Sequence, residues 1–349
     1  MMKKILAAAI ISAFAAPAFA ATANVDVYGT MHMSIDRLDD GRDSGTNVST
    51  NASNVGFKGT EDLGGGLSAI WQFETLVDMD GGSASAFGAQ RDSFVGLSNK
   101  TLGTLRLGFF DTPTKQLSRG LDFFNNEIGD TRNLLRSNNA NGVGGNAWEE
   151  RFNNGIRYDT PDFSGFSGSV HYATQFAAGV ADNNDADAYS LGGTYKNGPI
   201  FVGAAYQRNN LTATTDETSW RVGGSYTLAD LKVNALYHKA QDQRGLAGRD
   251  RSVWGLGAGY KLGNGLIKAQ YYKAGDEKVT VGDSGANMFA VGYDYNMSKR
   301  TKVYVDYAKT TNKALGSYSM SGGGHEDNLP VQGPGFDPSG FSLGMVHKF

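Results

Sequence analysis

The 349-residue chain contains no cysteine, which excludes a disulfide framework and any metal site built on thiolates. After the first twenty residues, no stretch approaches the ~18 consecutive apolar residues that a membrane-spanning helix needs. Basic residues are not in excess either, because 32 Lys and Arg stand against 35 Asp and Glu. A basic surface for nucleic acid is therefore not indicated, and we expect no nucleic-acid partner.

Residues 1–20 have the parts of a secretory signal peptide. Lys3 and Lys4 form a positive start, an apolar stretch follows, and residues 18–20 (AFA) match an A-x-A cleavage site. We therefore expect cleavage after this site and a mature protein that comprises residues 21–349. Loss of Lys3 and Lys4 changes the formal net charge from −3 to −5.

The rest of the chain alternates apolar and polar side chains in segments of about eight to ten residues, the length of a tilted membrane strand. Val303, Val305 and Tyr307, for example, share an apolar face, whereas Lys302 and Asp306 lie on the opposite face. Side chains of a strand point alternately to its two faces, so each segment predicts a strand with one apolar side. In an exported chain, this pattern favours an all-β fold, a transmembrane antiparallel β-barrel. The mean hydropathy of −0.36 is compatible with a barrel, because only alternate residues face lipid.

We count about sixteen strands between residues 24 and 349, and short connections alternate with long ones, as in outer-membrane barrels. The predicted long connections include residues 39–51 and 208–217. Tyrosines near the ends of the apolar faces predict aromatic girdles at the two membrane surfaces: Tyr195, Tyr206, Tyr226, Tyr237, Tyr260, Tyr271, Tyr293 and Tyr307. A secreted β-sandwich or solenoid is the alternative fold, although no fixed-period repeat supports a solenoid.

One segment interrupts the rhythm of strands. About forty residues separate the strand that ends at Phe110 from the one that begins near Arg151, and this is far longer than a usual loop. A barrel of about sixteen strands has an open aqueous lumen. A long loop folded into that lumen would narrow it, so we expect the functional site there.

Residues 54–67 (NVGFKGTEDLGGGL) and residues 91–97 (RDSFVGL) are the most distinctive motifs of the chain. The first resembles the second strand and first periplasmic turn of the trimeric general porins of Gram-negative bacteria, and the second resembles the fourth strand of that family. Residues 151–158 (RFNNGIRY) and 161–166 (PDFSGF) resemble the strand after the constriction loop and the turn that follows it. The resemblance covers the whole mature chain, with the middle strands alike only in style.

The resemblance implies a homotrimer of sixteen-stranded barrels in the cell outer membrane, each a passive channel for small hydrophilic solutes and ions. In that family the third extracellular loop folds inward and carries acids opposite a basic cluster on the wall. Arg91 and Arg151 match positions of that cluster. Lys58 faces the lumen by alternation with Val55 and Phe57, and Arg157 shares the parity of Arg151. We therefore predict a basic side of the constriction at Lys58, Arg91, Arg151 and Arg157.

Acidic partners are predicted in the first half of the long loop, where Asp122 and Glu127 lie; ordinary loop charges are the alternative for both. Two positions depart from the family pattern. Asn54 stands where many relatives have a third arginine, which leaves the choice between anions and cations open. Phe109 stands where relatives have a residue that helps to hold neighbouring subunits, although aromatic packing could replace it.

Enzyme chemistry is not indicated. The glycine-rich residues 255–259 lie in an alternating strand without the helix that phosphate binding requires, and the five histidines have no metal-ligand spacing. We expect no catalytic residue, no cofactor and no metal, and we expect contact with outer-membrane lipid and lipopolysaccharide. A substrate-specific porin, a barrel-embedded hydrolase and an adhesin or receptor remain the alternative functions.

Overall fold

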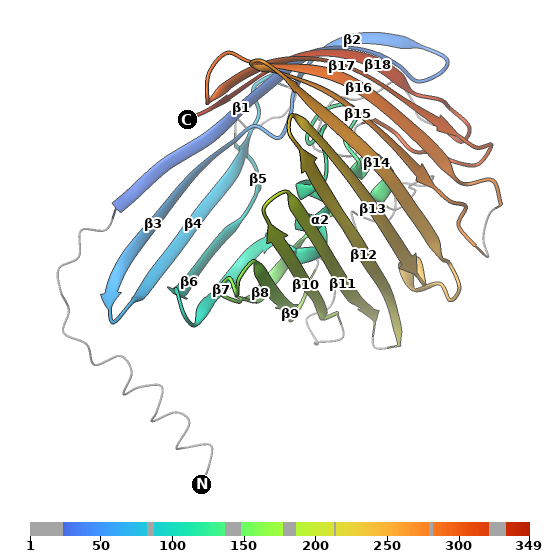
Figure 1. The fold of residues 1–349 in the computed structure, drawn as a ribbon. Coiled ribbons are helices and arrows are strands. Elements are labelled where there is room, and N and C mark those ends of the chain that lie inside the picture. The colour runs from blue at the N-terminus through green and yellow to red at the C-terminus, as the bar shows by residue number, and fades with distance from the viewer. Residues whose placement is uncertain are drawn as a thin grey trace.

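The computed structural model describes residues 24–81, 87–136, 148–176, 186–212, 214–278, 282–320 and 333–349. Its strands form one closed antiparallel sheet, drawn in Figure 1. The ring closes because β1 (Asn24–Asp39) pairs with the last strand, β18 (Ser339–Lys348), as well as with β2 (Ser44–Thr50) and β3 (Asn54–Gly64). The predicted signal peptide, residues 1–20, lies outside the described residues.

The 18 strand segments among the described residues make sixteen strands, because two strands are each interrupted once. β2 pairs with the second half of β1 and β3 with its first half, so both belong to one strand. In the same way, β5 (Phe87–Gln90) and β6 (Ser93–Asn99) both pair with β4 (Leu67–Val77). The predicted sixteen-stranded barrel is therefore confirmed.

The other strands follow in chain order, each antiparallel to its neighbour: β7 (Gly103–Asp111), β8 (Arg151–Asp159), β9 (Phe166–Ala173), β10 (Ala188–Asn197), β11 (Ile200–Thr212), β12 (Thr215–Leu228), β13 (Leu231–Gln241), β14 (Arg251–Leu262), β15 (Gly265–Ala274), β16 (Ala286–Asn296) and β17 (Thr301–Asn312). The helices of the described part are α2 (Pro113–Gly120), α3 (Arg132–Leu135) and the short 3-10 helix η1 (Gln243–Gly245). Among the described residues, every helix is too short or too polar to span a bilayer.

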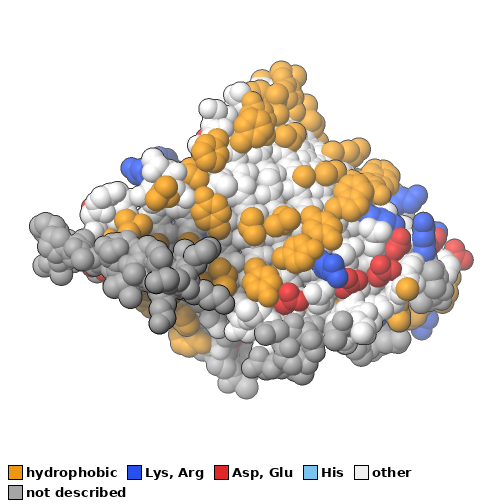
Figure 2. Space-filling view, turned by 90° about the horizontal axis from the view of Figure 1, so that it is seen from below, with side chains coloured by type: hydrophobic (Ala, Val, Ile, Leu, Met, Phe, Trp, Pro, Cys, Tyr) orange, Lys and Arg blue, Asp and Glu red, His pale blue; other side chains and the backbone are white. Residues whose placement is uncertain are grey.

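Alternation along each strand separates an apolar outside from a polar inside. On β17, Val305 is 48 % exposed, whereas Asp306 is 1 % exposed and Tyr304 is also buried. Figure 2 shows hydrophobic side chains spread across the face that it draws, with most of the charged side chains toward one edge. An outer surface with so many exposed apolar side chains is unfavourable in water. This agrees with the predicted position of the barrel in a bilayer.

Two of the predicted long connections are shorter than expected. Residues 44–50 of the expected loop 39–51 pair with β1, so only residues 40–43 connect the two strands. Likewise, β11 and β12 continue to Thr212 and from Thr215, within the expected loop 208–217. The physical reason is that Thr and Val are good strand formers. Strand pairing also gives hydrogen-bond partners to backbone groups that would lack them in a loop.

The described residues between β7 and β8, 112–136 and 148–150, lie inside the barrel, as predicted. This segment begins with α2, whose first turn is capped because the Thr112 side chain accepts a hydrogen bond from the Lys115 backbone N–H at 3.2 Å. Figure 1 shows α2 within the ring of strands. Leu117 and Leu121 from the start of the segment, and Leu134 and Leu135 from α3, pack with wall residues such as Tyr272. Burial of these leucines fixes the path of the loop across the inner wall.

Candidate functional site

Two clusters of charged side chains inside the barrel are important for the inward loop, one at the β7–α2 junction and one around Glu127. The open cluster comprises Glu74, Arg91, Asp92, Asp111, Lys115, Arg119 and Arg151. The anchor cluster comprises Glu127, Lys268, Asp294, Lys302 and Asp306. Each joins the loop to the wall, but the two differ in charge and in access to water.

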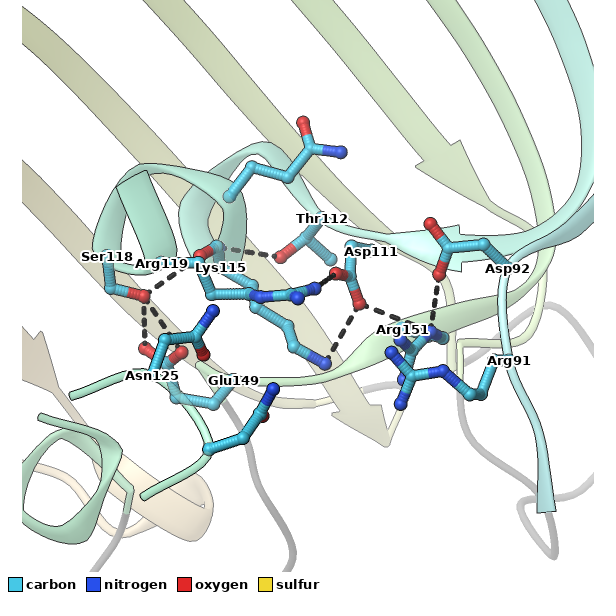
Figure 3. Close-up of polar contacts among 12 residues, drawn as sticks. Arg91, Asp92, Asp111, Thr112, Lys115, Ser118, Arg119, Asn125, Glu149 and Arg151 are labelled. Carbon is cyan, nitrogen blue, oxygen red and sulfur yellow. Dashed lines mark hydrogen bonds and ion pairs between the residues drawn. The ribbon is translucent and has the colours of Figure 1, made fainter. Parts of the chain in front are cut away.

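Asp111 is the centre of the open cluster, shown in Figure 3. Its carboxylate lies 2.9 Å from the Lys115 ammonium, 2.6 Å from Arg119 Nη1 and 3.2 Å from Arg151 Nε. Arg151 Nε also lies 2.5 Å from Asp92 Oδ1. One buried acid is thereby surrounded by three cations, which positions all of them.

Local sequence explains this convergence. Asp111 is the last residue of β7 and pairs in register with Arg151, the first residue of β8. The chain then turns at Thr112 into α2, where Lys115 and Arg119 lie four residues apart and therefore on one helix face. That face is directed back at Asp111, as Figure 3 shows.

A buried ion pair fixes the other side of α2. The Ser118 hydroxyl donates to Glu149 Oε2 at 2.9 Å, and Glu149 Oε1 lies 2.6 Å from Arg221 of β12. Arg221 also donates to the backbone oxygen of Thr114 at 2.7 Å. These contacts join the helix to the wall at both of its ends, so the cations on its open face have little freedom to move.

The open cluster is net positive. Four cations, Arg91, Lys115, Arg119 and Arg151, stand against three carboxylates, which leaves a formal charge of +1. Arg119 is its most accessible member, with 29 % of its side chain exposed. Burial lowers the pKa of Lys115 to about 8, although the neighbouring Asp111 opposes that shift.

The structure places all four predicted basic residues inside the barrel and brings two of them together. Arg91 pairs with Glu74 and Arg151 with Asp92, both within the open cluster. Lys58 is exposed and lies 5.1 Å above the ring of Tyr28, whose hydroxyl donates to Glu74 at 2.9 Å. Lys58 therefore borders the open cluster without pairing in it.

Arg157 has a different setting. It is buried, and its guanidinium donates to the Gln116 side chain at 2.8 Å and to the backbone oxygen of Asp111 at 2.9 Å. It also forms an ion pair with Asp159 at 2.7 Å. Its contacts with both ends of the β7–α2 junction make it a support of that junction.

The two predicted acids contact the wall or the loop itself. Glu127 is 1 % exposed and lies 2.8 Å from the Lys302 ammonium, and it also pairs with Lys268. Burial raises the pKa of Glu127, but Lys268 and Lys302 outweigh it and bring the pKa to about 2. Glu127 is therefore a charged anchor under the loop.

Asp122 closes a turn of the loop. Its carboxylate accepts hydrogen bonds from the backbone N–H groups of Phe124 and Thr131 at 2.9 and 3.0 Å, and from Gln270 of β15 at 3.0 Å. Burial and the neighbouring Asp130 raise the pKa of the Asp122 carboxyl. Its partners hold the loop in a compact turn against β15.

The three acids of the anchor cluster meet the distance requirement for a cation site. Glu127, Asp294 and Asp306 offer oxygens within 4.8 Å of one another. However, Lys268 Nζ lies 2.7 Å from Asp294 and 3.4 Å from Asp306 and also pairs with Glu127. The ammonium group takes the central position of a bound metal ion, so this donor set does not fit one.

The sequence analysis missed the cations that the loop itself contributes. Lys115 and Arg119 follow a Thr-Pro pair at four-residue spacing, which is a helix-start signal followed by one basic face. Lys268 has the same inward parity as Gln270, so strand alternation indicated its direction. The sequence did not indicate that the loop would cross the barrel and reach Lys268.

Both departures from the family pattern have clear local settings. The Asn54 side chain donates to the backbone oxygen of Ala52 at 3.0 Å, which places an amide beside the interrupted strand β2–β3. Phe109 is half-buried at an irregularity of the β7–β8 pairing, next to Gly108 with φ 149°. Phe110 shares the inward parity of Arg106, and its ring stacks on His171 at 4.6 Å.

Comparisons with known proteins agree on one family. The family model described as Gram-negative porin matches residues 7–315. The chain is 31 % identical over 360 residues to outer membrane porin protein 32 of Delftia acidovorans, with 100 % of each chain covered. It is 35 % identical over 220 residues, 60 % of each chain, to major outer membrane protein P.IB of Neisseria meningitidis serogroup B.

Solved structures extend this agreement to the fold. An anion-selective porin from Comamonas acidovorans superposes with a TM-score of 0.81 at 30 % identity, covering 94 % of this chain and 100 % of that chain. Salmonella typhi OmpF in complex with daunomycin has a TM-score of 0.70 at 16 % identity, with coverage of 93 % and 97 %. The second likeness concerns the fold alone.

Proposed function

The chain belongs to the Gram-negative porin family, and we propose that its pore favours small anions over cations. As a family member it is a passive diffusion channel of the outer membrane. The proteins to which it is similar are porins, which are channels rather than enzymes. The residues of this chain indicate, in addition, the sign of the electric field that a solute experiences as it passes through the lumen.

The net positive charge of the open cluster is the observation that supports anion preference. Four cations surround Asp111 and its neighbours where β7 leads into the inward loop. Low-dielectric walls strengthen such a field, so an anion in the remaining aqueous path is stabilised more than a cation. The similar protein from Comamonas acidovorans is itself described as anion-selective.

The predicted site residues take three roles in this proposal. Arg91 and Arg151 supply the field at the constriction, and Lys58 extends it along the wall. Arg157 supports the junction from which α2 enters the lumen. Asp122 and Glu127 act on the pore through the position of the loop, since both are occupied by loop or wall partners.

We also propose a homotrimer of chains that begin at residue 21, after removal of residues 1–20. Of the sixteen tyrosines, Tyr28, Tyr272, Tyr304 and Tyr318 have inward or buried side chains, and the other twelve lie on the outer face of β8 to β17. Among the described residues, the outer face of β1 to β7 has no tyrosine. Tyrosine marks membrane surfaces, so β8 to β17 would contact lipid and lipopolysaccharide, and β1 to β7 the neighbouring subunits.

Charge reversal tests the assigned field. Arg91→Glu with Arg151→Glu changes the open cluster from +1 to −3. A charge about 6 Å from an ion contributes about 0.7 kcal/mol in water, so four units after salt screening should lower the anion-to-cation permeability ratio about tenfold. Reversal potentials in planar bilayers under a salt gradient measure this ratio.

The matched control is Lys196→Glu with Lys299→Glu, which makes the same charge change at exposed residues near the short turns. We expect this control to leave the reversal potential near its original value. Equal shifts in both double variants would mean that the total charge of the protein sets the preference, and the proposal would then be wrong.

A further inference from the structure

A row of glycines lines the inner wall of the barrel where the inward loop crosses it. These wall glycines are Gly192 of β10, Gly203 of β11, Gly223 of β12, and Gly257 and Gly259 of β14. Each is covered by an apolar side chain of the loop, in the same order Pro113, Leu117, Leu121 and, over both glycines of β14, Phe123. The row therefore marks where the loop packs on the wall.

The contact at the wall glycines is too close for a larger residue. A Cβ atom at Gly192 would lie 2.7 Å from Pro113 Cβ, and one at Gly203 would lie 2.7 Å from Leu117 Cδ1. Carbon atoms in ordinary contact are about 3.5–4.0 Å apart. A side chain at either position would therefore need α2 to move away from the wall by about 1 Å or more.

Other glycines of the inner wall have a different cover. The Tyr304 ring of β17 lies over Gly344 of β18, and the Tyr272 ring of β15 lies over Gly255 of β14. In both cases the cover comes from a neighbouring strand, so the contact concerns the sheet alone. The wall glycines differ, because the segment that covers them begins with the helix that carries two cations of the open cluster.

α2 has its wall contacts and its cations on opposite sides. Pro113 and Leu117 are four residues apart and share one side of the helix, whereas Lys115 and Arg119 are offset from them by two residues. At 3.6 residues per turn, two residues correspond to a rotation of about 200°, so the second pair faces away from the first. The distance between α2 and the wall therefore determines how far its cationic side extends into the lumen.

We propose that Gly192 and Gly203 are positioning residues that set the width of the pore and the strength of its field, through the distance at which α2 packs on the wall. The lack of a side chain at both positions lets the helix approach β10 and β11 closely, which leaves more room for the aqueous path on its other side. The statement about the field rests on the proposed anion preference, whereas the statement about pore width does not.

Enlargement of Gly203 is the first test. Gly203→Val adds three carbon atoms between β11 and Leu117, and valine is a good strand former. The helix should move toward the lumen by about 1–2 Å and lower the single-channel conductance about 1.3- to 1.5-fold. Because Arg119 then lies closer to a permeating ion, the anion-to-cation permeability ratio should rise about twofold. Unchanged or increased conductance in planar bilayers would overturn the proposal.

An exchange of volume across the contact separates positioning from a general loss of packing. Leu117→Ala removes three carbon atoms from the helix, the same number that Gly203→Val adds to the wall. The double variant should therefore restore the wild-type conductance and reversal potential, since volume-conserving exchanges are tolerated best in a packed interior. A double variant that conducts like Gly203→Val alone would show that the valine acts on the strand and not through α2, and the proposal would be wrong.

Leu117→Ala alone provides a test that does not depend on folding of the valine variant. With a smaller side chain in the contact, the helix should move toward Gly203, because packed structures relax partly into a vacated space. Conductance should then rise about 1.2-fold and the permeability ratio should fall, both opposite to the effect of Gly203→Val. A conductance equal to that of the wild type would contradict the proposed role of this contact.

Two adjacent glycines of β10 form a matched pair for the same substitution. Gly193 lies on the outer face, where, among the described residues, an added Cβ atom would have no neighbour within 4 Å. Gly193→Ala should therefore conduct like the wild type, whereas Gly192→Ala should press on Pro113 and lower the conductance about 1.2-fold. Equal conductance of the two variants would overturn the role of Gly192.

The arginine variant described above keeps this inference distinct from the proposed function. If Arg91→Glu with Arg151→Glu retains its anion preference while Gly203→Val still lowers the conductance, the assigned field is wrong and the positioning of α2 stands. If the arginine variant loses its anion preference and Gly203→Val conducts like the wild type, only the positioning role is wrong. Conductance and reversal potential, measured on the same channels, distinguish the two results.

Discussion

The open cluster and the anchor cluster contain the same chemical groups and yet differ in what they can do. In the open cluster, four cations exceed three carboxylates, and Arg119 and Asp92 keep about a quarter of their side chains exposed. In the anchor cluster, two lysines face three carboxylates, and both Lys268 and Asp306 are fully enclosed. Lys302 is the one member of the anchor cluster with comparable exposure, at 26 %, so the anchor cluster presents less of its charge to water than the open cluster does.

This difference separates two uses of an ion pair in a channel. A partly solvated, unbalanced cluster creates a field that a solute experiences along its path. An enclosed cluster has little effect on a solute in the lumen. Removal of one partner from it lowers the stability of the fold strongly, because a buried charge is then uncompensated. The inward loop therefore uses both kinds of cluster: the open cluster acts on solutes, and the anchor cluster holds the loop in place.

Removal of the central lysine of the anchor cluster should have the largest effect. Lys268→Met leaves Glu127, Asp294 and Asp306 without their shared cation, and we expect the free energy of unfolding to fall by about 3–5 kcal/mol. The measurement is the temperature at which the folded barrel converts to the slower-migrating unfolded form on a gel.

Two controls sharpen this first prediction. Lys302→Met removes a cation that is 26 % exposed and shares only two of the acids, so its effect should be smaller. Lys261→Met changes an exposed lysine near a short turn and should have little effect. If the three substitutions destabilise the barrel equally, the anchor cluster has no special role in stability.

Deletion of the half of the inward loop that carries Glu127 should have an intermediate effect. Without residues 121–136, the anchored half of the loop is gone and the lumen widens, so single-channel conductance should rise about twofold, toward that of an unobstructed barrel. The same deletion keeps Lys115 and Arg119 on α2, and some anion preference should therefore persist. Unchanged conductance would mean that this half of the loop does not limit the path.

Alternation of residues predicted the barrel because each strand must present one face to lipid and one to water. Tyr304 and Asp306, for example, follow the inward parity that the sequence indicates. The position of the loop was predicted only as a direction, inward. The sequence predicts that Glu127 lines the constriction, but its pairing with Lys268, 141 positions away in the chain, depends on tertiary packing that no local pattern contains. The roles of Glu127 and Lys268 in holding the loop are a proposal that the Lys268 variant tests.

The smallest expected effect concerns the protonation of a single residue in the open cluster. Burial brings the pKa of Lys115 to about 8, below the 10.5 of a free lysine side chain. Lys115 is therefore charged below that pH and neutral above it, so the open cluster changes from +1 toward 0 as the pH rises. One charge about 6 Å from a solute contributes about 0.7 kcal/mol, so anion preference should fall about two- to threefold between pH 7 and pH 9.5.

Two substitutions at the same position isolate this effect from other titrations. Lys115→Arg keeps the charge through pH 9.5, and the anion preference should then stay nearly constant. Lys115→Met should lower the preference at pH 7 and remove its dependence on pH. The anchor cluster gives the contrast, because Glu127 has a pKa of about 2 and stays charged across this range. A pH dependence that persists in Lys115→Met would assign the titration to a different group and separate the field of the open cluster from this lysine.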